Sequence, residues 1–526
     1  MNENILKKVG IATFIMMASV FASRVIGVFR EMAIAGFGGI STKVDAYQIA
    51  FIIPEILNHI VASGFLSITF IPIFAHYLSL NRKEEGYKVF SIIINTFGLL
   101  LLCFIIVTLI YAPELVHIFA PGIQDPDTFA LAVKMTRIII PAQFFFFCGG
   151  LLMAVQFANE KFFIPALAPL IYNLSIITGG LVLGPFIGME GFAWGVLAGA
   201  FIGNFAIQII GARKLKIKYH PIISFTHPDL IKYIMLTLPL MIGLTMTFST
   251  EILLKFFGSY LDKGNIAAMN YALRVMFILV GLFGQAVGVA SYPFMAKLAQ
   301  KGEIMELNHL LNKTLKFIFL VIPISTLFMI LNHEIITILF QRGHFDENAT
   351  LITAGILPFF MAGAFAFSAQ NIVSRGFYAV QNTIFPAVFT TIAVIVTLPL
   401  IFIFMKTMGA QGVASGLSLS VIIQAFVLFE CWNKKSDNLE KKEVYLFFFK
   451  MIPISLIIGL TLFITKYGLT NLFDFEGFYG SLFITLIIGI EFLSVFYLSG
   501  LIFKIREILV LYDNIYTKLC SLIKIK

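Results

Sequence analysis

Long apolar stretches separated by short polar connectors run along the whole chain. Crossing about 30 Å of hydrocarbon takes roughly 20 residues of α-helix, and fourteen stretches reach that length. Their continuous apolar character predicts helices rather than the alternating strands of a membrane β-barrel. The stretches lie near 9–36, 44–80, 88–112, 129–157, 163–186, 190–213, 229–257, 265–299, 309–331, 349–378, 384–408, 410–432, 446–468 and 477–503. The first has no small-residue cleavage site and is expected to be a retained span rather than a signal peptide.

The composition supports the same class of protein. Of the 526 residues, 59% are hydrophobic and only 12% are charged, whereas an ordinary soluble protein has about 45–50% apolar and about 25% charged residues. Because so few charges cannot cover a water-facing surface, a soluble multidomain enzyme is excluded. The sequence therefore predicts an all-α polytopic membrane protein with fourteen transmembrane helices.

The basic residues predict the orientation of the chain. The net charge is +9, but its placement argues against nucleic acid as a partner. If the N-terminus is cytoplasmic, 25 of the 37 Lys and Arg residues fall in cytoplasmic segments. Basic loops are retained on the cytoplasmic side of a membrane, so both termini are expected there. The five basic residues expected outside are Lys43, Lys263, Arg342, Lys406 and Lys466.

Matching residues also recur along the chain at a constant separation, the repeat offset. This offset equals the separation of Pro72 from Pro293. Because this offset covers six spans, both copies have the same orientation, as in parallel-repeat transporters. Two such six-helix bundles are expected to enclose a central cavity that opens to alternate sides of the membrane. The other matching landmarks include Phe119 with Phe340, Gly122 with Gly343, Ala158 with Ala379, Pro165 with Pro386, Gly191 with Gly412, and Gly195 with Gly416.

The repeat predicts four domains along the chain. Residues 1–215 form the N-terminal six-helix bundle, and residues 216–435 form its repeat. Residues 436–503 add two transmembrane helices, and residues 504–526 form a basic cytoplasmic tail.

Ionisable residues inside the predicted spans are the candidate functional residues. Each costs from about 2.5 kcal/mol upward at the centre of a bilayer. Basic residues predominate among them, and arginine suits the planar, bidentate binding of phosphate or carboxylate. The sequence therefore predicts an anionic cargo. The candidate substrate-binding residues are Arg24, Arg30, Glu31, Asp45, Glu55, Arg137 and Arg274, with Lys134 close to Arg137.

Motifs of enzymes are missing from the sequence. There is no Gly-x-x-x-x-Gly-Lys-Ser/Thr phosphate loop and no His-Glu-x-x-His zinc motif. The four cysteines have unrelated spacings and form no metal signature. We therefore expect a transporter rather than an enzyme, without a cofactor or a bound metal, driven by an ion gradient, the membrane potential or the cargo gradient.

The segment Ser23-Arg24-Val25-Ile26-Gly27-Val28-Phe29-Arg30-Glu31 resembles the opening signature of the MurJ/MviN family. Asp45-Ala46, Pro54 and Phe70-x-Pro72-x-Phe74 continue the resemblance at matching spacing. This family lies in the multidrug/oligosaccharidyl-lipid/polysaccharide exporter superfamily. The resemblance implies a flippase for lipid II, the undecaprenyl-diphosphate-linked peptidoglycan precursor, in the bacterial inner membrane.

The resemblance also implies roles for individual residues. Arg24 and Arg30 match the two arginines of the family's first span, Asp45 its second-span acid and Arg274 its eighth-span basic residue. These residues would line the cavity and bind the diphosphate and the sugar-peptide head. The two final helices would form a groove for the polyprenyl tail. The resemblance further implies coupling to Na⁺ or the membrane potential, and the cell-wall synthesis machinery as a partner.

The sequence departs from the family pattern at four positions. Asn58 and His59 stand where many members have basic residues, and Leu273 and Phe277 stand where acidic residues are common. This thinner set of charges keeps open a flippase for another polyprenyl-linked glycan. Glu491 in the last span has no evident partner in the sequence.

Other functional classes remain as alternatives. A cation-coupled multidrug exporter of the same superfamily is expected to have acidic cavity residues, whereas the excess here is basic. A membrane glycosyltransferase or acyltransferase would need acid and base residues at a catalytic face. A non-transporting scaffold would have no use for arginines inside the membrane.

Overall fold

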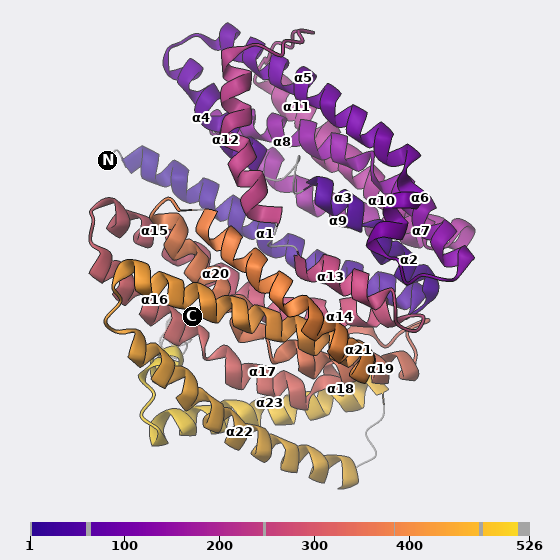
Figure 1. Cartoon of the computed structure of the whole chain (residues 1–526), viewed down its shortest axis with the longest axis vertical. Coiled ribbons are helices and arrows are strands. Elements are labelled where there is room, and N and C mark those ends of the chain that lie inside the picture. Colours follow the sequence, from indigo (N-terminus) through magenta and orange to yellow (C-terminus); the bar gives the residue numbers. More distant parts are fainter. Residues whose placement is uncertain (1–2, 59–64, 246–248, 383, 473–476, 514–526) are drawn as a thin grey trace, which may run out of the picture. The chain divides into compact units, whose positions relative to one another are not determined.

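Helices are the only regular elements in the part of the chain that the structure, a computed structural model, describes: residues 3–58, 65–245, 249–382, 384–472 and 477–513 (Figure 1). The chain forms two compact units. The first unit contains residues 1–267 and 342–345, and the second contains residues 268–341 and 346–526. The prediction of an all-α protein is confirmed.

The first unit contains both long helices and short helical pieces. They are α1 (Glu3–Gly38), α2 (Thr42–Ala50), α3 (Ile52–Leu57), α4 (Phe65–Ser79), α5 (Lys83–Ile110), α6 (Ala112–Phe119), α7 (Pro126–Ile139), α8 (Ala142–Ala158), α9 (Phe163–Ile187), α10 (Glu190–Gly199), the π-helix η2 (Ala200–Ala206), α11 (Ile207–Lys214), α12 (Pro228–Thr245) and α13 (Ser249–Gly258).

The second unit contains the remaining helices, apart from the first turn of α14, which belongs to the first unit. They are α14 (Asn265–Leu279), the π-helix η3 (Val280–Gln285), α15 (Ala286–Gln300), α16 (Ile304–Ile318), α17 (Val321–Ile330), α18 (Asn332–Phe340), α19 (Glu347–Met361), α20 (Ala364–Ala379), α21 (Ile384–Ser436), α22 (Lys441–Leu472) and α23 (Gly477–Ile502). Helix α21 is two helices joined at Gly409, where φ is 58°.

Nine helices of the described chain are long and apolar enough to cross a membrane, and the bent pair α19 and α20 would make ten. Because every backbone N–H and C=O inside a bilayer must be satisfied within the protein, helices are the expected form for these segments. The chain is therefore a multi-pass helical membrane protein.

Helix boundaries recur at the repeat offset that the sequence predicted. The first residues of α5 and α16 are separated by this offset, and so are those of α7 and α19 and those of α9 and α21. The last residues of α8 and α20 have the same separation. The N-terminal caps of α7 and α19 recur as well: Asp125 accepts a hydrogen bond from the backbone of Thr128, and Asp346 accepts one from the backbone of Ala349. At most of these paired positions, the two side chains differ.

The turns between the helices recur at the same offset. Left-handed backbone conformations, which are uncommon for residues other than glycine, occur at corresponding positions in the two series. The pairs are Asn81 with Gly302, Glu160 with Gln381, Gly188 with Gly409, and Lys216 with Asp437.

Glycines bring neighbouring helices into close contact at the predicted repeat positions. A Cβ atom on Gly195 of α10 would lie 2.6 Å from the carbonyl oxygen of Ser175 on α9. In α21, a Cβ atom on Gly412 would overlap the carbonyl oxygen of Phe404. Small residues at such helix contacts are typical of membrane proteins.

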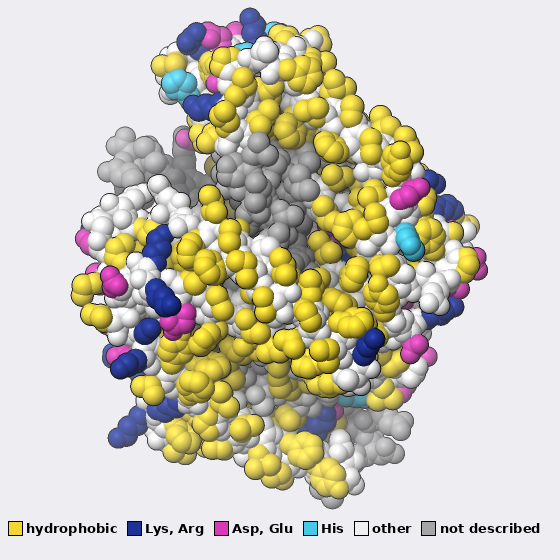
Figure 2. Space-filling view, in the orientation of Figure 1, with side chains coloured by type: hydrophobic (Ala, Val, Ile, Leu, Met, Phe, Trp, Pro, Cys, Tyr) yellow, Lys and Arg dark blue, Asp and Glu magenta, His cyan; other side chains and the backbone are white. Residues whose placement is uncertain are grey.

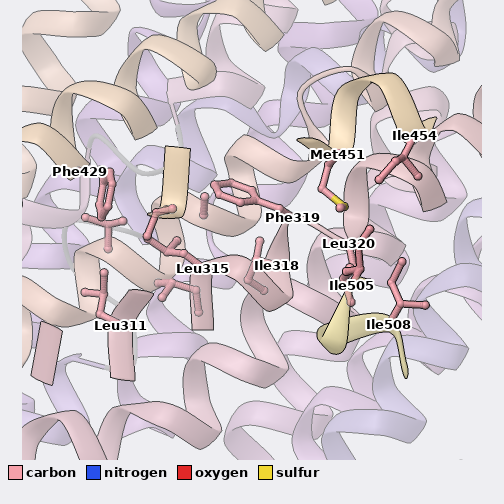
Figure 3. Packing of buried hydrophobic residues seen from close by; sticks show 14 of the residues in the cluster. Leu311, Leu315, Ile318, Phe319, Leu320, Phe429, Met451, Ile454, Ile505 and Ile508 are labelled. Atoms are coloured by element: carbon pink, nitrogen blue, oxygen red, sulfur yellow. The ribbon is translucent and has the colours of Figure 1, made fainter. Parts of the chain in front are cut away.

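The two C-terminal helices are anchored to the second unit by a continuous apolar core (Figure 3). Met451 and Ile454 of α22 belong to the same buried cluster as the apolar face of α16. The segment after α23 joins the cluster through Ile505 and Ile508. Figure 3 labels these residues with Leu311, Leu315, Ile318, Phe319, Leu320 and Phe429.

The outer faces of α22 and α23 carry large exposed apolar side chains. Leu456, Leu460 and Ile490 are 69%, 61% and 66% exposed. Figure 2 shows hydrophobic side chains over most of the visible surface, and basic side chains near the ends of α15, α16 and α22 at the left of the view. Such a surface suits hydrocarbon over the middle of the helices and polar surroundings at their ends.

Candidate functional site

The candidate site begins at the seam between α1 and α9 in the first unit. Ser19 donates a hydrogen bond to the carbonyl of Ala166. The side-chain amide of Asn173 on α9 donates to the hydroxyl of Ser23 at 3.2 Å. The small residues at these two positions thus face a neighbouring helix. Gly27, four residues after Ser23, has no atom of the described residues within 4 Å of the place where a Cβ would stand.

Arg30 is held on this seam by two acceptors. Its Nη1 donates to Oδ1 of Asn173 at 3.0 Å, and its Nη2 donates to Oε1 of Glu31 at 2.5 Å. The Arg30 side chain remains 23% exposed, whereas that of Glu31 is 8% exposed. The guanidinium is therefore oriented by both helices while part of its surface stays accessible. Arg24 lies six residues earlier on α1, about 9 Å along the helix axis, and is exposed.

Glu55 forms a second charged contact in the first unit. Its Oε2 lies 2.8 Å from Nζ of Lys255, which belongs to α13 and is 1% exposed. Glu251 lies one turn from Lys255 on the same helix, a spacing that permits an ion pair. The ammonium group of Lys255 pairs instead with Glu55 on α3.

Asp45 accepts two hydrogen bonds from the start of another helix. Its Oδ2 accepts from the backbone N–H of Gly264 at 2.5 Å, and its Oδ1 accepts from that of Ala267 at 2.8 Å. Asp45 is 6% exposed. A carboxylate at this position satisfies the free N–H groups of the first helical turn. Asp45 therefore positions the start of α14, the helix that carries Arg274.

Lys134 and Arg137 stand on the exposed surface of α7. Lys134 forms an ion pair with Glu190 of α10 at 2.7 Å. The Nε of Arg137 donates to the carbonyl of Leu109, at the end of α5, at 3.0 Å. Both basic groups are thus tied to neighbouring helices within the first unit.

Arg274 is half-buried on α14, within the second unit. Two positions near Arg274 that depart from the family pattern, Leu273 and Phe277, pack against apolar groups. Leu273 is completely buried, and the ring of Phe277 packs edge-on against Phe367 of α20. A charge at position 273 would lie in a packed apolar core. Asn58 follows the end of α3, and His59 lies outside the described residues.

The turns after α1, α6 and α13 and the turn of residues 342–345 make close contacts within the first unit. The backbone N–H of Gly122 donates to the hydroxyl of Ser259 at 3.1 Å, and that of His344 donates to the carbonyl of Gly36 at 2.9 Å. A Cβ atom on Gly122 would overlap the carbonyl of Ser259, and one on Gly343 would overlap that of Gly36. Only glycine permits these close backbone approaches.

Asp125 adds an ion pair to the same cluster of turns. Hydrogen bonds from Thr128, followed by the ammonium group of Lys263 at 3.2 Å, hold the pKa of the Asp125 carboxyl below its usual value. The carboxylate therefore remains ionised at neutral pH and caps α7.

Several polar contacts were not found by sequence reasoning. Asn173 bridges Arg30 and Ser23, and its position inside an apolar span was the one available signal. In the second unit, Lys466 of α22 pairs with Glu334 of α18 at 2.7 Å. The Thr465 hydroxyl donates to Glu491 at 2.9 Å, which gives that carboxyl a partner.

The Phe144–Phe147 run is mostly covered inside the first unit. Phe147 is completely buried. Phe145 packs against Phe201 and Phe205, and Phe146 packs against Tyr172.

Solved structures define the class of this fold. A multidrug resistance MATE family transporter of the MOP superfamily, in an inward-facing conformation, matches with a TM-score of 0.67. The match covers 80% of this chain and 96% of that chain at 15% identity, so it shows the fold alone. The protein has the same helical fold as this structure.

More similar proteins specify the family. A structure of lipid II flippase MurJ in an inward closed conformation matches with a TM-score of 0.75 and 27% identity, covering 93% of this chain and all of that one. The family model described as lipid II flippase MurJ matches residues 34–487. The chain belongs to the MurJ family, and the resemblance seen in the sequence is confirmed.

Curated relatives agree with this assignment. A probable lipid II flippase MurJ of Thermotoga maritima is 27% identical over 489 residues, which cover 93% of this chain and 95% of the relative. The lipid II flippase MurJ of Burkholderia cenocepacia is 26% identical over 449 residues, covering 83% and 86% of the two chains.

Proposed function

We propose that this protein flips lipid II from the cytoplasmic to the periplasmic leaflet of the bacterial inner membrane by alternating access. The family match across residues 34–487 carries this proposal. The oriented, partly exposed guanidinium of Arg30 supplies a group that can bind the diphosphate. Transport of this kind breaks no covalent bond, so the protein acts as a transporter and not as an enzyme.

The proposed architecture has fourteen spans in two parallel six-helix bundles and a C-terminal pair. The bundles comprise residues 1–215 and 216–435, followed by two helices within 436–503 and a basic tail at 504–526. The recurrence of helix starts, caps and left-handed turns at the repeat offset supports this duplication. The compact units are divided later, after Ala267, because α12 and α13 pack with the first unit.

In the proposed cycle, Arg24, Arg30 and Arg274 attract the diphosphate. Glu31 orients Arg30, and Asp45 orients the start of the helix that carries Arg274. Glu55 and Arg137 complete the proposed set of substrate-binding residues. The locked turns around Gly122 and Gly343 support a starting state that is closed on the periplasmic side. Parting of these turns would release the head group.

The proposal also includes the orientation of the chain in the membrane, the energy source and the functional partner. The distribution of basic residues supports a cytoplasmic location of both termini. Na⁺ or the membrane potential would reset the empty transporter. The cell-wall synthesis machinery that consumes lipid II at the outer leaflet would be its functional partner.

The test is a complementation experiment in a bacterium depleted of its own lipid II flippase. Labelled lipid II accessible at the outer leaflet is measured after expression of the wild type, Arg24→Ala, Arg274→Ala and, as a control for charge loss, Lys161→Gln. We expect the two arginine variants to accumulate in the membrane without restoring accessible lipid II, and the control to restore it. Normal flipping by both arginine variants would overturn the assignment of the cavity.

One alternative cargo has a specific observation in its favour. Leu273 and Phe277 pack against apolar groups and stand where many family members have charges. The absence of these charges suits a related polyprenyl-linked glycan with a different head group. Accumulation of such a glycan at the inner leaflet on depletion of this protein, with unchanged lipid II exposure, would establish this alternative.

A further inference from the structure

An open apolar groove lies on the first unit, away from the α1–α9 seam. It is bordered by α5, α8, α11 and the connector of residues 215–227, and it has a volume of about 640 Å³. This volume falls within the range of about 300–1,000 Å³ that is usual for ligand sites. Leu99 and Leu102 line the groove and are 42% and 38% exposed. The groove therefore offers accessible apolar surface to an occupant.

The length of the groove matches one leaflet of a bilayer. Its lining runs along α5 from Phe90 to Leu102, which corresponds to about 18 Å of helix rise. Half of the hydrocarbon core is about 15 Å thick. Gly98 lies between these ends and also lines the groove.

The connector forms a fixed wall of the groove. The side-chain amide of Asn95 donates to the carbonyls of His220 and Ile222 at 3.0 and 3.1 Å, and the Tyr219 hydroxyl donates to Asn95 at 2.7 Å. Ser91 accepts from the backbone N–H of His220 at 3.0 Å. These hydrogen bonds hold the connector against α5, so the apolar side chains of the connector form one wall of the groove.

One end of the groove carries an available positive charge. Arg213, in the last turn of α11, is exposed and lines the groove. Within the described part of the chain, Arg213 has no carboxylate at ion-pair distance, whereas the nearby Lys218 is paired with Glu84 at 2.6 Å. An arginine at the polar end of an apolar groove suits an amphiphile with an anionic head.

We propose that this groove binds an anionic diacyl phospholipid, phosphatidylglycerol, from the leaflet on the connector side. One acyl chain lies along α5 between Phe90 and Leu102, and the phosphate is bound by Arg213. This lipid is a resident ligand and not the transported cargo, because the groove involves neither Arg24 nor Arg30. The proposal is independent of which head group the transporter flips.

The experiment uses the full-length protein in mixed micelles with phosphatidylglycerol carrying a photoreactive acyl chain. The labelled peptides are identified by mass spectrometry. We expect labelling of α5 and α8 residues that line the groove, and competition by unlabelled phosphatidylglycerol but not by phosphatidylcholine. Arg213→Gln is expected to weaken this labelling about tenfold, as loss of one hydrogen bond to a charged group would do.

Two further variants separate the groove from general lipid contact. Leu99→Trp fills the groove and should abolish the labelling, whereas Lys161→Gln removes an exposed charge elsewhere on the first unit and should leave it unchanged. Each variant is checked for the thermal unfolding midpoint of the wild type. If Leu99→Trp fails this check, Leu102→Trp fills the same groove. Equal labelling by both phospholipids, insensitivity to Arg213→Gln, or displacement by undecaprenyl phosphate would overturn the proposal.

Discussion

At the level of single residues, the guanidinium of Arg30 is oriented by hydrogen-bond acceptors although it lies on an apolar helix. One acceptor, Glu31, follows it in the chain, and the other, Asn173, comes from α9. Two acceptors from different helices fix the plane of the guanidinium, which is the property that bidentate phosphate binding needs. Sequence reasoning identified Arg30 and Glu31, but the partner from α9 depends on how the two helices pack.

Replacement of Arg30 tests this arrangement. Arg30→Ala removes a charge-assisted contact worth about 1.5–3 kcal/mol, so we expect a ten- to hundredfold loss of lipid II binding by the purified protein. Arg30→Lys keeps the charge but not the planar fork and should lie between the two. Unchanged binding in Arg30→Ala, at a normal level of folded protein, would contradict the role of this residue.

The ion pair of Glu55 and Lys255 makes an asymmetric prediction. Lys255 is 1% exposed, so Glu55→Gln leaves a buried charge without its partner and should cost about 3–5 kcal/mol. Lys255→Met leaves only the more exposed carboxylate behind and should cost less. The thermal unfolding midpoint in detergent measures both changes.

A double variant serves as the control for this pair. Because the penalty comes from the unpaired charge, Glu55→Gln combined with Lys255→Met should be more stable than Glu55→Gln alone. Additive losses in the double variant would show that the two groups do not act as a pair.

At the scale of elements, helix ends do much of the positioning. Asp45 caps the first turn of α14, and Asp125 and Asp346 cap α7 and α19. The two aspartates of α7 and α19 directly precede their helices, so their capping role is readable from a sequence pattern. Asp45 is far from α14 in the sequence, on the other side of many intervening helices, and no local pattern connects them.

Removal of the Asp45 carboxylate should loosen the start of α14. Loss of a helix cap costs about 1 kcal/mol, so Asp45→Ala should speed hydrogen exchange of the amides at residues 265–269 about fivefold. The matched variant Asp125→Ala should speed exchange at the start of α7 and leave α14 unchanged. Equal exchange in α14 for wild type and Asp45→Ala would contradict the capping role.

At the scale of the whole molecule, close contacts occur at turns as well as between helices. The turns around Gly122 and Gly343 approach the ends of α13 and α1 so closely that a side chain would not fit. These two glycines are partners at the repeat offset. The same offset recurs in helix boundaries and left-handed turns.

Substitution of Gly343 should weaken the closure of these turns. Its φ is 59°, where a residue with a Cβ costs about 1–2 kcal/mol, and the Cβ would also overlap the carbonyl of Gly36. In a Ser259→Cys background, we expect Gly343→Ala to raise labelling by a membrane-impermeant maleimide applied outside.

Gly150→Ala provides the matched control for this substitution. No atom lies within 4 Å of the place where a Cβ would stand on Gly150. We expect its labelling to equal that of the background, and equal labelling in Gly343→Ala as well would refute a gating role for this turn.

The sequence by itself determined the class of protein, which is an all-helical membrane protein of the MurJ family. This class depends on local apolar length and on the residues of a motif along the chain, which need no knowledge of packing. The sequence also identified most of the charged candidates, because an ionisable residue within an apolar stretch is evident without a structure. Only the tertiary structure decided which groups meet: Glu55 with Lys255, Asp45 with the start of α14, and the connector of residues 215–227 with α5. Such partners are distant in sequence, and the rotation and packing of whole helices bring them together, which no periodic pattern encodes.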